Sequence, residues 1–104
     1  MERLVVSITT LRGPVPEMDE TGGVAGEALL PWLRDLEGFR GVLIATDEAR
    51  GQAKVMTFWE SRSAADRSRA SRESMRDRMA ATVGMTVEST EAFVVASLEL
   101  VDAS

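Results

Sequence analysis

The sequence contains no cysteine, histidine, asparagine or tyrosine among its 104 residues. Without cysteine there is no disulfide, no thiolate nucleophile and no soft metal site. Without histidine the chain lacks the commonest general base, the commonest transition-metal ligand and the usual haem ligand. Acid–base chemistry near pH 7 therefore requires an Asp or Glu with a raised pKa, Lys54 with a lowered pKa, or reactivity that the substrate itself supplies. We expect neither a metal nor a bound cofactor.

Net charge and hydropathy narrow the range of partners. The net charge of −5 disfavours nucleic acid and anionic membranes as binding partners. No run of about 18 apolar residues is present, which argues against a membrane-spanning helix, and the N-terminus has the pattern of a strand rather than of a secretory signal. The length fits one domain over residues 1–104. We predict a single cytoplasmic domain that binds neither nucleic acid nor membrane.

The hydrophobic periodicity predicts four strands and two helices. Alternating apolar residues rich in β-branched types indicate the strands, whereas apolar residues at the i, i+3, i+4 and i+7 spacing indicate the first helix. The expected strands are residues 3–12, 39–47, 53–60 and 86–101, and the expected helices are residues 24–37 and 63–83.

Glycine, proline and serine mark the expected ends of these elements. Pro31 lies inside the first helical pattern, where it either kinks the helix or sets its start. Gly38 and Gly84 suit the left-handed positions that end the two helices. Gly51 suits a hairpin turn between the second and third strands. Ser63 is the expected N-cap of the second helix, because Ser63–Asp66 resembles a capping box.

The resulting order is strand–helix–strand–strand–helix–strand. It predicts an α+β, ferredoxin-like βαββαβ fold, an antiparallel four-stranded sheet with two helices on one face. A monomer of this kind needs polar residues on the open face of its sheet. Three strands are instead apolar on both faces; the first, for example, places Val6 and Ile8 on one side and Val5 and Leu11 on the other. We therefore predict that the open face is covered by a second copy of the chain in a homodimer.

The chain resembles the dimeric α+β barrel superfamily, in particular the antibiotic biosynthesis monooxygenase-like (ABM) domains. Four segments carry the resemblance: the first strand Val5–Thr10, the junction Leu33–Val42, the hairpin closed by Gly51, and the step Phe58–Ser61 into the second helix. The likeness covers nearly the whole chain and implies pairing into a dimeric α+β barrel.

The resemblance also implies a chemistry. Members that oxidise polycyclic aromatics use Asn, Trp, Arg and Tyr around a pocket, without metal or flavin, and this chain has only the Trp and the Arg. Trp59 is the best positional match, and Arg72 would stabilise a developing phenolate. The implied function is cofactor-independent monooxygenation of a polycyclic or phenolic small molecule, with Trp59 and Arg72 as catalytic residues. Haem-degrading members need Asn and His, which this chain lacks.

Five further residues are candidates for lining a ligand pocket, because flat aromatic rings and thioethers both suit aromatic ligands. They are Trp32, Met56, Phe58, Met75 and Met79. Each has a structural alternative as an ordinary core residue, and Arg72 has the alternative of a salt bridge or a solvated side chain. The alternative function is a non-catalytic small-molecule-binding or stress-responsive dimeric barrel.

Overall fold

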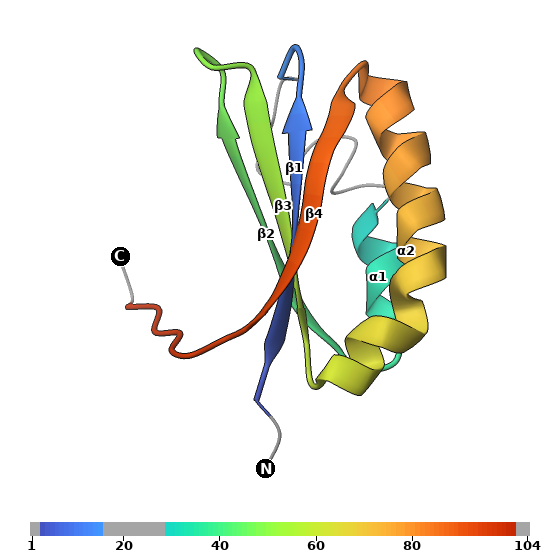
Figure 1. Cartoon of the computed structure of the whole chain (residues 1–104), viewed down its shortest axis with the longest axis vertical. Coiled ribbons are helices and arrows are strands. Elements are labelled where there is room, and N and C mark those ends of the chain that lie inside the picture. The colour runs from blue at the N-terminus through green and yellow to red at the C-terminus, as the bar shows by residue number, and fades with distance from the viewer. Residues whose placement is uncertain (1–2, 16–28, 102–104) are drawn as a thin grey trace.

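The computed structural model describes residues 3–15 and 29–101. Its elements are β1 (Val5–Arg12), α1 (Leu30–Arg34), β2 (Phe39–Asp47), β3 (Gln52–Trp59), α2 (Arg62–Val83) and β4 (Thr86–Val94). The strands form one antiparallel sheet in the order β2-β3-β1-β4, and both helices lie on the same face of it (Figure 1). The predicted α+β fold with βαββαβ order is confirmed. In this part of the chain no helix has the length and apolar character needed to cross a membrane.

The last strand is shorter than predicted. It ends at Val94, and residues 95–101 are not in a strand. The reason is the length of the neighbouring strand: the Val95 amide still donates to the Leu4 carbonyl at 2.9 Å, but β1 begins at Val5 and offers no further partner. An alternating apolar pattern requires a neighbouring strand as well as its own propensity, and residues 96–101 have none within the described part of the chain.

The first helix is also shorter than predicted. Residues 24–28 of the predicted span lie outside the described residues. Pro31 occupies one of the first two helical positions, where proline is well tolerated, so it sets the start of the helix. After Arg34 the amides of Asp35 and Leu36 donate to carbonyls three residues back. These tighter turns replace the last predicted helical residues.

The second helix begins at Arg62, one residue before the predicted span, and the prediction of Ser63 as its N-cap is wrong. Ser61 is the cap: its backbone is extended, and its Oγ accepts a hydrogen bond from the Ala64 amide at 3.1 Å. The Ser63 hydroxyl lies in the first turn and accepts from Arg67 instead. The helix ends as predicted, with Gly84 in the left-handed conformation.

The core lies where the two helices meet the Val5 and Trp59 ends of β1 and β3. It consists of Val5, Leu33, Trp59, Ala64 and Ala65, all nearly inaccessible to solvent. Gly38 closes it from the side, because a Cβ atom there would lie 2.5 Å from the Cβ of Ala64. The small residue at this point lets the chain entering β2 approach the start of α2.

The two faces of the sheet carry different kinds of side chain, and the open face is more apolar than the open face of a monomer usually is. Register places three rows of four residues on the open face: Gly41-Phe58-Val6-Phe93, Leu43-Met56-Ile8-Glu91 and Ala45-Lys54-Thr10-Ser89. The middle rows of the helix-covered face are Val42-Thr57-Ser7-Ala92 and Ile44-Val55-Thr9-Thr90. On β1 and β4 the covered rows thus carry only small and hydroxyl side chains, with larger aliphatic residues confined to β2 and β3, whereas two rows of the open face are largely apolar.

Candidate functional site

A cavity of about 120 Å³ lies between the covered face of the sheet and the helices. Its walls are mainly apolar. The sheet contributes Leu11, Ile44, Ala53 and Val55, and the segment Leu29–Leu33 together with α2 contributes Leu29, Trp32, Leu33, Met79, Ala80 and Val83. An apolar cavity of roughly 150 Å³ accepts a benzene molecule. This cavity therefore has about the volume that one aromatic ring occupies.

The cavity exists because the covered strands carry small polar residues in their middle rows. Ser7, Thr9 and Thr57 line it where large aliphatic side chains would fill it. Ser7 and Thr57 are buried, and the Thr57 hydroxyl accepts a hydrogen bond from the indole nitrogen of Trp59 at 3.0 Å. Hydroxyl groups buried in this way are stable only because they have hydrogen-bond partners.

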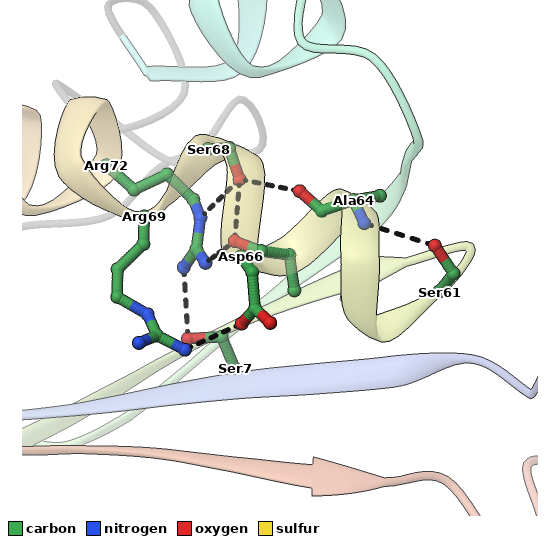
Figure 2. Close-up of polar contacts among 8 residues, drawn as sticks. Ser7, Ser61, Ala64, Asp66, Ser68, Arg69 and Arg72 are labelled. Carbon is green, nitrogen blue, oxygen red and sulfur yellow. Dashed lines mark hydrogen bonds and ion pairs between the residues drawn. The ribbon is translucent and has the colours of Figure 1, made fainter.

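Arg72 forms the charged part of the cavity wall. Figure 2 shows its guanidinium reaching from α2 towards the sheet, among oxygen atoms of α2 and β1. Nε donates to the Ser68 hydroxyl at 2.9 Å, Nη1 to the Ser7 hydroxyl at 3.1 Å, and Nη2 to the Ala65 carbonyl at 2.7 Å. The guanidinium carbon also lies 4.8 Å from the ring centroid of Trp59, a cation–π contact. Arg72 is thereby held in one orientation.

The electrostatic environment of Arg72 is unusual for a half-buried cation. Burial lowers the pKa of its guanidinium, and the nearby charge of Arg69 lowers it further against the opposing effect of Glu73 and Asp66. Within residues 3–15 and 29–101 no carboxylate lies within 4.0 Å of it, whereas Arg69 pairs with Asp66 at 2.7 Å. A guanidinium has five N–H donors, so one on Nη1 and one on Nη2 have no partner in the described chain. Arg72 is therefore a positioned cation that forms no ion pair among the described residues.

The structure brings three of the predicted site residues to the cavity: Trp32, Arg72 and Met79. Trp59 has no exposed surface and does not line the cavity, although it contacts Arg72 from behind. Met75 is half-buried on α2 outside the cavity wall.

Met56 and Phe58 lie on the other face of the sheet. Side chains alternate along a strand, and Val55 and Thr57 are the β3 residues that line the cavity. The structure therefore places Met56 and Phe58 away from the remaining candidates.

Arg76 is a site residue that the sequence interpretation missed. It also lines the cavity, and its Nη1 donates to the Thr90 hydroxyl at 3.0 Å. The available signal was its position one turn after Arg72 on the same helix, where i and i+4 side chains are neighbours.

The cavity offers its occupant apolar surface, hydroxyls and positive charge, but no base. Among the described residues that line it there is no aspartate, glutamate or lysine, and nowhere in the described ranges do three carboxylates gather as a metal site needs. Comparison of the chain with family models, with curated proteins and with solved structures finds no match.

Proposed function

We propose that the chain is a small-molecule-binding domain of the ABM-like, dimeric α+β barrel kind, and that its ligand is a small aromatic or phenolic molecule held in the cavity. One observation carries the proposal: an apolar cavity of ring size has in its wall a half-buried arginine that forms no ion pair among the described residues. A core built only for stability gains from filling such a space, because empty volume costs packing energy. The unfilled cavity and the charge of Arg72 in its wall both favour a bound ligand.

An aromatic ring that carries an ionisable oxygen matches this lining best. The ring takes the apolar walls, beside the indole of Trp32. The oxygen takes the N–H groups left on Arg72, because charge-assisted hydrogen bonds to a phenolate are stronger than neutral ones.

A homodimer is the second part of the proposal. Leu43 and Phe93, on the apolar rows of the open face, are 50% and 48% exposed in the single chain. Beyond β4, Leu100 is 89% exposed. Lys54 and Glu91 give the same face one charge of each sign, which suits self-association about a two-fold axis. A second copy of the chain satisfies all of these features with one interface.

Filling the cavity is expected to abolish most ligand binding. Ala80→Leu adds three carbon atoms to a buried alanine of the cavity wall. We expect it to weaken the binding of phenol by about tenfold or more, since overpacking a site of this size costs about 1–3 kcal/mol. Isothermal titration calorimetry measures the change. Ala81→Leu is the matched control, because Ala81 is the next residue of α2 and is exposed. Equal affinity of the two variants would contradict the proposal.

Cofactor-free oxygenation is a more specific candidate, favoured by the position of Arg72. With a hydroquinone as substrate, the anion formed at a phenolic oxygen donates electrons to dioxygen. A ring carbon gains one oxygen atom, the molecule loses two hydrogens overall to become a hydroxyquinone, and the second oxygen atom leaves as water. Since the described lining holds no base, the substrate proton passes to solvent, and Arg72 contributes by stabilising the anion.

Removing the charge of Arg72 is expected to slow this reaction. Arg72→Met should reduce the rate of dioxygen consumption with a hydroquinone by about a hundredfold, the usual effect of losing one donor to a developing oxyanion. Arg78→Met is the control, because it removes the same charge from an exposed position of α2. An oxygen electrode measures the rate, and wild-type uptake no faster than buffer over a panel of single-ring quinols would reject the oxygenase while leaving the binding proposal intact.

A further inference from the structure

A second hollow lies beside the cavity, between α2 and the strands β1 and β4. Its volume is about 310 Å³. Unlike the cavity, it is lined mainly by charged and hydroxyl side chains. Four arginines contribute to it: Arg62, Arg69, Arg72 and Arg76. They fall on one side of α2, at spacings of three, four or seven residues. We call this hollow the arginine groove.

The cavity and the arginine groove share part of their walls. Ser7, Thr9, Arg72 and Arg76 line both. The two arginines therefore stand at the boundary between an apolar space and a polar one. Hydroxyl groups of the sheet hold both guanidinium groups in place: Arg72 donates to Ser7 on β1, and Arg76 donates to Thr90 on β4. A single molecule that occupies both spaces has to pass these two guanidinium groups.

The net charge of the groove indicates the charge of its occupant. Two carboxylates of α2, Asp66 and Glu73, line it together with the four arginines. Glu91 also borders the groove, but its side chain lies on the open face of the sheet, so two positive charges are in excess. Arg69 is paired with Asp66 at 2.7 Å and Arg76 with Asp77 at 2.9 Å. Arg62 and Arg72 have no ion pair within the described ranges. Of these two only Arg72 also lines the cavity, so the boundary between the two hollows suits one negative charge.

We propose that the ligand is an aromatic monocarboxylate, with its ring in the cavity and its carboxylate at the Arg72–Arg76 boundary of the arginine groove. The inference rests on the proposed function, which supplies the ring, and adds the charged group and its place. Arg72 keeps one N–H on each terminal nitrogen for a carboxylate oxygen, and planar guanidinium groups recognise carboxylates with good geometry. Ser7 and Thr9 supply further hydroxyls beside it.

The test compares two probes that share a ring and a shape but differ in charge, benzoate and benzamide. Calorimetry of the full chain at neutral pH is expected to give at least tenfold tighter binding of the carboxylate. Arg76→Gln is expected to reduce this preference severalfold, and Arg76→Glu to reverse it so that the amide binds better. Arg78→Met, which removes a charge outside both hollows, should keep the wild-type preference. Thermal unfolding of each variant establishes that the fold is retained.

The outcomes separate this inference from the proposal on which it rests. If both probes bind equally, and Ala80→Leu weakens both, the cavity is a ligand site and the carboxylate inference is wrong. If the preference for the carboxylate survives in Arg76→Glu, the boundary is not its binding place and the inference is also wrong. If neither probe binds to the wild type, the inference and the proposed aromatic ligand fall together.

Discussion

Replacement of Trp59 by alanine is expected to lower the free energy of unfolding by about 3–5 kcal/mol. The side chain has no exposed surface and lies at the centre of the core cluster. It packs edge-on against Phe39 with ring centroids 5.6 Å apart, donates its indole N–H to Thr57, and carries the Arg72 guanidinium on its ring face. Truncation removes all three contacts and leaves a large cavity. Urea denaturation at one fixed protein concentration measures the loss.

Trp32 is the matched control, because it is the same residue type at a half-buried position of the cavity wall. Trp32→Ala should lower the free energy of unfolding clearly less than Trp59→Ala does. It should also weaken the binding of aromatic ligands, because Trp32 lines the cavity and Trp59 does not. Trp59→Phe, which keeps a buried ring, should recover much of the stability. If the free energy of unfolding of Trp59→Ala is within about 1 kcal/mol of the wild-type value, Trp59 is not the main core residue, since core truncations of this size cost more.

The order and type of the elements were predictable because local signals agree with the fold. β2 occupies the predicted residues 39–47, and Gly38, Gly51 and Gly84 all adopt positive φ angles. Positive φ is the property that favours glycine. Errors occur where a nearby partner decides the outcome. Residues 96–101 have the pattern of a strand without a neighbour in the described part of the chain, and the choice of Ser61 over Ser63 as N-cap depends on where β3 delivers the chain.

The site was less predictable than the fold, because its chemistry depends on which residues face each other across layers. Arg72 was identifiable as a polar break in the apolar stripe of α2. Its contact with Ser7, 65 residues away in sequence, was not. The alternation that puts Thr57 inside and Phe58 outside is visible in the sequence, but the face that the helices cover is not. Aromatic and methionine residues near one another in sequence, such as Met56 and Trp59, therefore separate onto opposite faces.

This separation leaves the apolar open face on which the proposed homodimer depends, and the second large expected effect tests that homodimer. Leu43 lies in one row with Met56 and Ile8, and Phe93 lies in the next row with Phe58. The wild type is expected to sediment at twice the chain mass of 11.3 kDa. Leu43→Glu should raise the dimer dissociation constant by more than about a hundredfold, since each unpaired charge buried at an interface costs about 3–5 kcal/mol. The two-fold axis introduces that charge twice.

The monomer fold should tolerate Leu43→Glu, because this side chain is already half exposed in the single chain. Circular dichroism is expected to show retained secondary structure while sedimentation shows the lower mass. Ala70→Glu adds the same charge at an exposed position of α2 and should leave the dimer intact. A wild type that sediments as a monomer at micromolar concentration would remove the second copy as the cover of this face. The cavity on the opposite face of the sheet would remain, because every residue that lines it comes from one chain.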